Sequence, residues 1–492
     1  MRSRLNTIAL SQLPPGVAVP SYDRRSVETG IVHLGIGAFH RAHQAVYTDD
    51  VLALDPNWGI VAASLRSPDT QDALEPQNGL YTLSVRSEAG EKLRVIGSIS
   101  QVILAPQAFD ALMSVMTDPH VRIVSLTVTE KGYCHDPATG ELDEAHPDIV
   151  HDLAHWQQPK SAPGLVVEAL RRRRVAGIPP FTVLTCDNLP SNGRTVHRIL
   201  TRYASLVDPD LGRFVADEVA CPSTMVDRIV PATTDEDRAR IEKALGFRDA
   251  WPVVTEPFTQ WVIEDRFPQG RPAWEKAGAE FVADVEPYEQ MKLRLLNGSH
   301  STLAYLGYLA GYETVSDAMA DADFERLITA LMDKDVTPTL HMPPGADLAH
   351  YKKALVARFK NPALKHRTGQ IAMDGSQKLP QRLLGTIRDR LREKAPIGRL
   401  ALGVAAWMRY VTGIDENGAP FEVRDPMSAR LRALADAAGK DPVQLAESLF
   451  GVREIFGDDL PQDPGFTQPV IAALMTLYRD GARRSVAEFR SD

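Results

Sequence analysis

Cysteine is scarce in this chain of 492 residues, and its scarcity argues against two kinds of cross-link. The three cysteines, Cys134, Cys186 and Cys221, lie far apart and form no CxxC pair. A disulfide framework is therefore not expected, and the thiolates are too few at ligand spacing for a structural zinc site. We predict a function that needs no metal.

Long apolar runs and an excess of basic residues are also missing. No run of about 18 apolar residues occurs, and residues 1–17 lack the continuous apolar stretch of a secretory signal. A net charge of −9 does not favour a nucleic-acid or membrane binder, although it allows a local basic pocket for an anionic substrate. These absences predict a cytoplasmic protein without nucleic-acid or membrane partners. The sequence is compatible with a monomer and with a small homo-oligomer.

The first half of the chain alternates short apolar runs with helical patterns. The runs at 31–34, 60–63, 121–126 and 181–185 predict buried parallel strands, which right-handed connections would wind into a Rossmann-like domain. The later part is dominated by long helical patterns. We therefore predict an α/β fold with a Rossmann-like dinucleotide-binding domain (1–285) and a mainly α-helical substrate and catalytic domain (286–492). The strongest helical patterns of the second domain lie at 288–310, 317–332, 383–394, 397–411 and 427–437.

A glycine turn directly follows the first predicted strand. Its two glycines permit a tight turn and a close approach of the backbone to a pyrophosphate at a helix N-terminus. The third glycine of the usual GxGxxG pattern is replaced by His40. His40 and His43 have the spacing of a metal-binding pair, but no nearby carboxylate completes a ligand set, and we expect both near the cofactor phosphates. The candidate cofactor-binding residues of this turn are Gly35, Ile36, Gly37, Ala38, Phe39 and His40.

The end of the second predicted strand bears on the choice of nicotinamide cofactor. NAD-selective folds usually carry an acidic residue there, whereas this chain has Arg66, with Asp69 a few residues later. Arg66 either accommodates the 2′-phosphate of NADP or is a solvated surface charge. We favour NAD and leave NADP open.

Four polar residues share one face of a predicted helix between 288 and 310. At 100° per residue and with Lys292 at zero, Glu289 falls near about 60°, His300 near about 80° and Asn297 near about 140°. Oxidation of a secondary alcohol needs a base for the hydroxyl proton and donors for the developing alkoxide. Partial burial and nearby positive potential would lower the pKa of Lys292 enough for it to be that base. The alternative is a solvated amphipathic face.

Polar residues also close two predicted strands of the first domain. Asn188 lies in the segment CDNLPSNG after the strand 181–185, where a Rossmann crevice would find a second amide donor. The alternative is an ordinary Asx turn, to which Asp187 or Asn192 would also belong. The segment TEKGY closes the strand 121–126 in the same way, and it contributes the candidate cofactor-binding residues Thr129, Glu130 and Lys131.

Several ordered motifs together resemble the mannitol dehydrogenase family, the polyol-specific long-chain dehydrogenases. The resemblance runs nearly from end to end through GIGAFHRAH, TEKGY, CDNLPSNG, STMVDRIVP, EPFTQWVIEDRF and KLRLLNGSH. It implies a zinc-independent oxidoreductase of carbohydrate metabolism, acting on CH–OH with NAD(P), with its active site between a Rossmann and a helical domain. It implies the following roles: Lys292 as base, Asn188 and Asn297 as oxyanion donors, His300 and Asp227 as substrate-side residues, and Glu289 in a proton path.

The substrate is a sugar acid or a polyol by this resemblance. Lys378 matches a substrate-side lysine of the family, whereas Gln370 stands where mannitol-specific members have arginine. The form DGSQKLPQR is more similar to the fructuronate reductase (mannonate oxidoreductase) branch. Positive charge suited to a substrate carboxylate is offered by His366, Arg367, Lys378 and Arg382, unless the two arginines are surface charges.

Other functions remain as alternatives. D-Mannitol/D-fructose (mannitol 2-dehydrogenase) and arabinitol are alternative substrates to D-mannonate/D-fructuronate. A silent NAD-binding sensor would have no need to keep Lys292, Asn188, Asn297 and His300 together. A sugar-phosphate dehydrogenase would need a phosphate cradle, and residues 286–492 contain no Gly-rich loop that clearly offers one.

Overall fold

The computed structural model describes residues 2–136, 139–343 and 345–489. The chain forms two compact units, Met1–Glu289 and Gln290–Asp492. Glu289, the last residue of the first unit, lies in α11 (Glu286–Met291), whereas the boundary expected from the sequence lies just before this helix. Among the described residues, no helix is both long and apolar enough to cross a membrane.

The first unit is built on a parallel sheet whose strand order is that of a Rossmann fold. Its five strands lie in the order β5-β2-β1-β6-β7, which places the first strand in the middle. The four predicted strands are among them, and β5 was not foreseen. The bounds are β1 Thr29–Leu34, β2 Gly59–Ser64, β5 Ile99–Leu104, β6 Ile123–Leu126 and β7 Thr182–Thr185.

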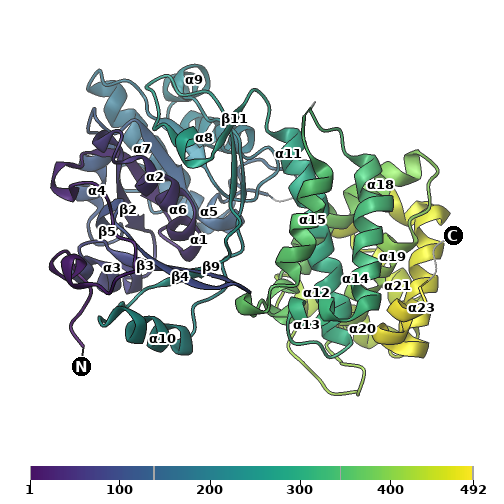
Figure 1. Cartoon of the computed structure of the whole chain (residues 1–492). Helices are drawn as coiled ribbons and strands as arrows, with labels where there is room; N and C mark the ends of the chain where they lie inside the picture. The colour runs from purple at the N-terminus through teal and green to yellow at the C-terminus, as the bar shows by residue number, and fades with distance from the viewer. Residues whose placement is uncertain (1, 137–138, 344, 490–492) are drawn as a thin grey trace. The chain divides into compact units, whose positions relative to one another are not determined.

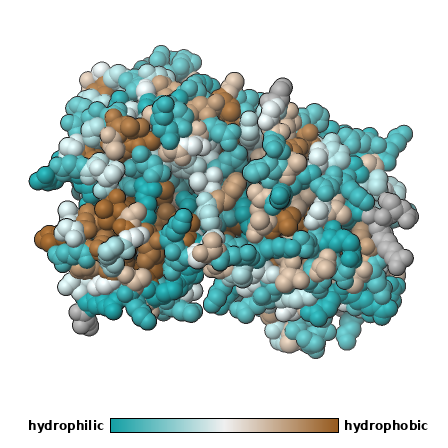
Figure 2. Space-filling view, in the orientation of Figure 1, coloured by the Kyte–Doolittle hydropathy of each residue, from teal (hydrophilic) through white to brown (hydrophobic). Residues whose placement is uncertain are grey.

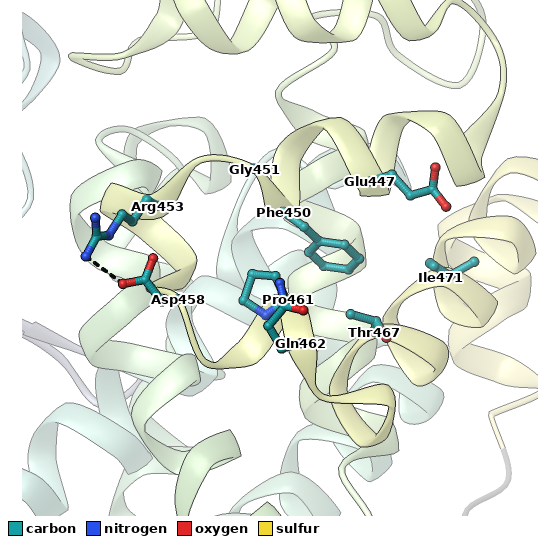
Figure 3. Close-up of a pocket in the computed structure, with 10 residues that line it drawn as sticks. Glu447, Phe450, Gly451, Arg453, Asp458, Pro461, Gln462, Thr467 and Ile471 are labelled. Carbon is teal, nitrogen blue, oxygen red and sulfur yellow. Dashed lines mark ion pairs between the residues drawn. The ribbon is translucent and has the colours of Figure 1, made fainter.

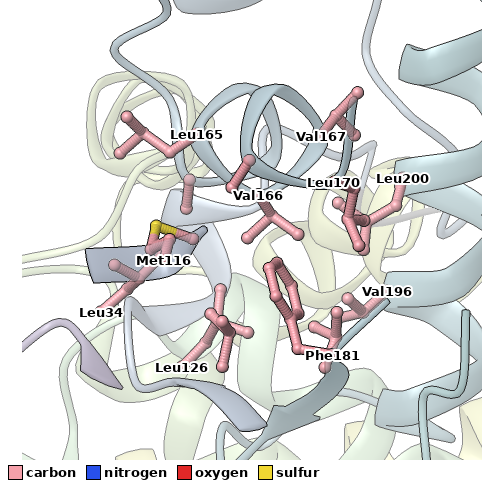
Figure 4. Packing of buried hydrophobic residues seen from close by; sticks show 14 of the residues in the cluster. Leu34, Met116, Leu126, Leu165, Val166, Val167, Leu170, Phe181, Val196 and Leu200 are labelled. Atoms are coloured by element: carbon pink, nitrogen blue, oxygen red, sulfur yellow. The ribbon is translucent and has the colours of Figure 1, made fainter. Parts of the chain in front are cut away.

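Both faces of this sheet are buried, which explains why its strands are apolar without alternation. Val32 and Leu34 of β1 belong to one cluster, in which Leu34 lies with residues of α4, α7 and α8 (Figure 4). Ile31 belongs to a second cluster on the other face. The helices of the unit are α1 Ala38–Ala42, α2 Gln44–Val51, α3 Asp69–Leu74, α4 Phe109–Met116, α5 Thr129–Gly132, α6 Pro147–Ala154, α7 Ala162–Val175, α8 Asn192–Val207, α9 Pro209–Glu218 and α10 Asp235–Leu245.

Two small sheets accompany the parallel sheet, and the sequence patterns did not predict them. One joins the antiparallel pair β3 (Tyr81–Ser87) and β4 (Gly90–Ile96) to β9 (Val253–Thr255). The other has the order β11-β10-β8, in which β8 ends at Asp227, and it consists of β8 Thr224–Asp227, β10 Gln260–Glu264 and β11 Glu280–Val282.

The described residues of the second unit form helices and no β-strand, and the helices run from green to yellow in Figure 1. The helices α12, α19 and α23 pack against one another, and α19 is buried along most of its length. The bounds are α12 Ser299–Leu309, α13 Val315–Ala320, α14 Ala322–Ala330, α15 Leu348–Phe359, α16 Thr368–Ile371, α17 Gly375–Leu379, α18 Gly385–Arg392, α19 Gly398–Tyr410, α20 Ser428–Ala438, α21 Pro442–Phe450, α22 Arg453–Phe456 and α23 Pro464–Ala487.

Two of the long helical patterns are interrupted in the structure. The pattern at 288–310 contains a π-helical turn, Lys292–Gly298, between α11 and α12. The pattern at 317–332 breaks at Asp321, whose side chain accepts the Asp323 N–H and caps α14. Two further π-helical turns, Leu331–Val336 and Pro380–Leu384, follow α14 and precede α18. Regular α-helical periodicity was therefore the wrong expectation at these places.

Candidate functional site

The glycine turn after β1 fits a dinucleotide. Gly35 has a φ of +95°, and a side chain there would bring its Cβ within 2.2 Å of the Thr127 carbonyl oxygen, so only glycine is tolerated. At Gly37, by contrast, a Cβ would meet only the Gly35 oxygen, at 3.9 Å. The protein leaves this space open, directly before the first turn of α1, as close approach of a pyrophosphate requires.

The two histidines that follow the turn have separate, buried partners. The ring of His40 is fully buried and stacks on the ring of His33, with centroids 3.4 Å apart. His43 Nε2 lies 3.0 Å from the Gln260 carbonyl oxygen. The His40 ring therefore lies inside the core beside His33, and the nearness of the two histidines to the cofactor phosphates stays a prediction.

Arg66 lies at the surface near an acidic residue. Its side chain is 78% exposed, and its guanidinium lies 3.8 Å from the Asp148 carboxylate. Asp148, His146 and Cys134 bring potential metal ligands within 4.8 Å of one another, but His146 Nδ1 accepts the Asp148 N–H as the cap of α6. These partners favour a structural role for the cluster. The contact of Arg66 with the cofactor stays a prediction.

The segment after β6 is tied to the segment after β7. The N–H groups of Val128 and Thr129 donate to the Asp187 carboxylate at 2.8 and 3.2 Å, and the Tyr133 hydroxyl donates to it at 2.8 Å. Asp187 therefore does not form the local Asx turn that the sequence allowed. This arrangement holds α5, which contains Thr129, Glu130 and Lys131, next to the residue that precedes Asn188.

Asn188 is exposed and lies in a loop held at both ends. Asn192, four residues after the candidate donor Asn188, donates its side-chain amide to the Asp187 and Thr224 carbonyl oxygens at 3.0 and 2.9 Å. The Glu289 carboxylate accepts the Ser191 N–H at 3.0 Å, at the start of α8. Asp227, at the end of β8, is buried. The first unit thus contains Asn188, Asp227 and Glu289 on elements that are firmly connected.

Lys292 and Asn297 lie in the same π-helical turn of the second unit. The α-helical arithmetic above placed them about 140° apart, and this expectation is corrected. In a π-helix each hydrogen bond spans one residue more than in an α-helix, so residues five apart come closer to alignment. Lys292, Asn297 and His300 are each 7% exposed, which excludes the alternative of a solvated face.

The π-helical turn packs closely against another part of the unit. A Cβ at Gly298 would lie 2.8 Å from the Arg382 carbonyl oxygen, so the absence of a side chain lets the turn Pro380–Leu384 approach. Arg294 points elsewhere, as expected, and pairs with Asp389 at 2.6 Å.

His300 lies in a buried environment of positive charge. Its ring packs on Phe359 and, edge on, against His366 at a centroid distance of 5.2 Å. Burial first, and then the charges of His366, Arg382, Arg358 and Lys378, hold the pKa of His300 well below its usual range. Within the described parts of the chain, His300 Nε2 and His366 Nδ1 have no hydrogen-bond partner. These two buried ring nitrogens lie beside cationic groups.

The remaining predicted substrate-side residues are divided between this cluster and the surface. Lys378 Nζ donates to the Met373 carbonyl oxygen at 2.5 Å, and Arg382 donates to the Ser301 hydroxyl at 3.1 Å. Burial and Lys378 lower the pKa of His366 to about 4. Arg367 is different, because its side chain is 69% exposed and pairs with Glu313. This exposure favours the alternative that Arg367 is a surface charge, and its contact with substrate stays a prediction.

Arg358 was missed by the sequence reasoning, although a signal was present. It is buried on α15 in register with Tyr351, Leu355 and Phe359, which form the apolar face of that helix. A charged residue at such a position is uncommon unless it is paired or meets a ligand. The charged interruption of an apolar stripe would have identified it.

A separate hollow of about 550 Å³ lies between α21, α22 and α23 (Figure 3). Phe450, Thr467 and Ile471 line it, together with an ion pair between Arg453 and Asp458 at 2.6 Å. None of the predicted site residues is among its lining residues. Polar side chains cover much of the molecular face in Figure 2, and apolar ones gather mainly over the first unit.

Comparison with known proteins identifies the family. The mannitol dehydrogenase Rossmann domain matches residues 29–276, and the mannitol dehydrogenase C-terminal domain matches residues 284–478. The uncharacterized oxidoreductase YeiQ of Escherichia coli strain K12 is 49% identical, over 98% of this chain and 99% of its own length. The D-mannonate oxidoreductase of the same strain is 48% identical, over 98% of this chain and 100% of its own.

A solved structure agrees with this assignment. Pseudomonas fluorescens mannitol 2-dehydrogenase, in a ternary complex with NAD and D-mannitol, is 42% identical with a TM-score of 0.92, over 98% of both chains. The chain belongs to the mannitol dehydrogenase family. The predicted family, fold class and enzyme class, a nicotinamide-dependent oxidoreductase acting on CH–OH, are confirmed.

Proposed function

We propose that this chain interconverts a secondary alcohol and a ketone on a sugar acid, with D-mannonate and D-fructuronate as the pair and NAD as the cofactor. The observation that carries the proposal is the positive charge near His300, which comes from the buried Arg358 and from the half-buried Lys378 and Arg382. A neutral polyol does not need this charge, whereas a carboxylate does. The D-mannonate oxidoreductase of Escherichia coli is one of the similar relatives, which supports the same choice.

The chain's own residues would manage the proton and the oxygen. Lys292 takes the hydroxyl proton as general base, and the amides of Asn188 and Asn297 donate to the oxygen as its negative charge develops. His300 and Asp227 orient substrate hydroxyls, and Glu289 passes the proton onward. The chemistry that NAD supplies when bound is acceptance of the hydride.

The test is a substrate and cofactor panel. We expect D-fructuronate to be reduced with a kcat/KM at least about tenfold above that of D-fructose. A hydrogen bond to a charged group contributes about 1.5–3 kcal/mol, which corresponds to a factor of about ten or more. D-Tagaturonate and D-xylulose complete the panel, each with NADH and with NADPH, and NADH should be the better reductant. Faster reduction of fructose than of fructuronate would contradict the sugar-acid assignment. Absence of any NADH oxidation would point to a silent binding protein.

A further inference from the structure

Asp187 connects two strand ends of the Rossmann unit. It follows β7, yet its carboxylate oxygens accept the N–H groups of Val128 and Thr129, which follow β6. These two hydrogen bonds connect the segment after the carboxyl end of β6 to the segment after the carboxyl end of the neighbouring strand β7. The side chain therefore joins the segment that contains the candidate cofactor-binding residues to the segment that contains Asn188.

A closed set of hydrogen bonds strengthens this connection. The Tyr133 hydroxyl donates to Asp187 Oδ2 and lies 2.6 Å from Thr185 Oγ1, and the Asp187 N–H lies 3.4 Å from the same oxygen. Tyr133 is buried at the end of α5, and Thr185 is the last residue of β7. Both ends of α5 are thereby attached to Asp187.

The conformation that Asp187 stabilises is an unfavourable one. Thr129 has a φ of +62°, in the left-handed region that β-branched residues rarely adopt. Such a residue persists only where the surrounding structure over-determines it, and these residues cluster at functional sites. On the other side, Asn192 fixes the Asp187 carbonyl oxygen, so both flanks of the loop 186–192 are held.

We infer that Asp187 is a positioning residue that couples the cofactor-side segment Thr129–Lys131 to the alkoxide donor Asn188. The inference rests on the proposed function, because it takes Asn188 as that donor. With Asp187 ionised, both segments are in one fixed arrangement. When it is lost, each segment is free to relax, so cofactor binding and turnover should change together.

The ionisation of Asp187 supplies an independent readout. Surrounding protein atoms displace water and raise its pKa to about 7, and the negative charge of Glu130 adds to the rise, whereas the Tyr133 hydroxyl and the two N–H donors oppose it. Cys186, the preceding residue, is the other titratable group that faces it. A protonated carboxyl is a weaker acceptor, so kcat should fall as the pH drops through about 7.

The stability effect of the same group has the opposite direction. Because the pKa is higher in the folded chain than its ordinary value of 3.8, the folded state loses stability as the pH rises from about 4 to about 7. This dependence should disappear in Asp187→Asn. A merely structural acceptor of hydrogen bonds would leave the pH profile of kcat unchanged.

The experiment compares Asp187→Asn, Tyr133→Phe, Asn188→Ala and a matched control. Asp152 is the control, because it is fully buried and its carboxylate also accepts two backbone N–H groups, those of Lys160 and Ser161. We expect Asp187→Asn to lower kcat at least about tenfold and to raise the KM for NAD at least about threefold. The fall of kcat below about pH 7 should disappear in this variant. Asp152→Asn should lower stability and leave both constants unchanged.

The outcomes separate the inference from the proposed function. Tyr133→Phe, which removes only one donor, should shift kcat and the KM for NAD in the same direction by a smaller factor, and it remains informative if Asp187→Asn fails to fold. Asp187→Asn and Tyr133→Phe variants with the constants and pH profile of Asp152→Asn would overturn the inference. So would a fall in kcat with an unchanged KM for NAD. Full turnover in Asn188→Ala would instead remove Asn188 from the proposed mechanism.

Discussion

In the Rossmann unit the candidate site residues follow the ends of strands and are fixed by hydrogen bonds to backbone groups, whereas in the helical unit they are enclosed by buried side chains. Asp187 and Asn192 fix the loop of Asn188 through N–H groups and carbonyl oxygens. Lys292 and Asn297 depend instead on an irregular helical turn and its packing.

The difference concerns which kind of substitution each unit tolerates. A strand-end residue fixed by the backbone keeps its place when a neighbouring side chain changes, provided that the hydrogen-bonding residue remains. A residue on a buried π-helical turn depends on the shape of the turn that packs against it. We therefore expect different substitutions in the helical unit to affect different properties: the chemical step, the preference for a charged substrate, or the stability of the packing.

The largest expected effect is that of Lys292→Ala, which removes the proposed base from the helical unit. We expect kcat to fall by roughly 10²- to 10⁴-fold, as for removal of a general base. The dissociation constant for NADH should change little, because the glycine turn lies in the other unit. Steady-state turnover and fluorescence titration with NADH measure the two quantities. Lys334→Ala, in a second π-helical turn but exposed, is the matched control, and equal turnover in the two variants would refute the assigned role.

An intermediate effect is expected for Arg358→Gln, which removes one buried cation near His300. The kcat/KM for D-fructuronate should fall roughly 10- to 100-fold, because a hydrogen bond or ion pair to a charged group is lost, while that for D-fructose should change much less. Arg367→Gln provides the control, since this arginine lies at the surface. An equal loss on the acid and on the neutral ketose would make Arg358 a structural residue.

A smaller effect, on stability, is expected for Gly298→Ala. The new Cβ would lie 2.8 Å from the Arg382 carbonyl oxygen, so the two π-helical turns must separate. We expect the free energy of unfolding in urea to fall by about 1–3 kcal/mol, as for other overpacked sites. Gly385→Ala is the control, because its Cβ would meet only the Pro380 oxygen, at 3.9 Å, and alanine favours helix there. Equal stability of both variants would show that the close approach is not needed.

The residues at strand ends could be placed from the sequence, because the rule that governs them is topological. The carboxyl ends of parallel strands share one edge of a sheet, so the glycine turn after β1 and Asn188 after β7 were expected at the same edge. The partner of Asp187 could not be predicted in this way. Its hydrogen bonds to Val128 and Thr129 depend on the distance between two loops, which no periodicity encodes.

In the helical unit, the sequence singled out residues that the structure buries near one another, but part of their predicted geometry was wrong. The polar set around Lys292 was found, but regular 100° steps misplaced Asn297 relative to it. Arg367 and Arg358 show that the sequence alone does not tell which arginine is buried. The exposed arginine was predicted as substrate-binding from its charge alone, and the buried one was overlooked within an apolar stripe.

The sequence by itself determined the order of apolar strands and helices, the glycine turn, and the ordered motifs that identify the family. These are local features, set by side-chain chemistry and backbone freedom over a few residues. Only the tertiary structure decided the π-helical turn at Lys292, the positive surroundings of His300 and the connection through Asp187. Each of these depends on contacts between segments far apart in the chain, where close packing and the loss of water set the geometry and the charge.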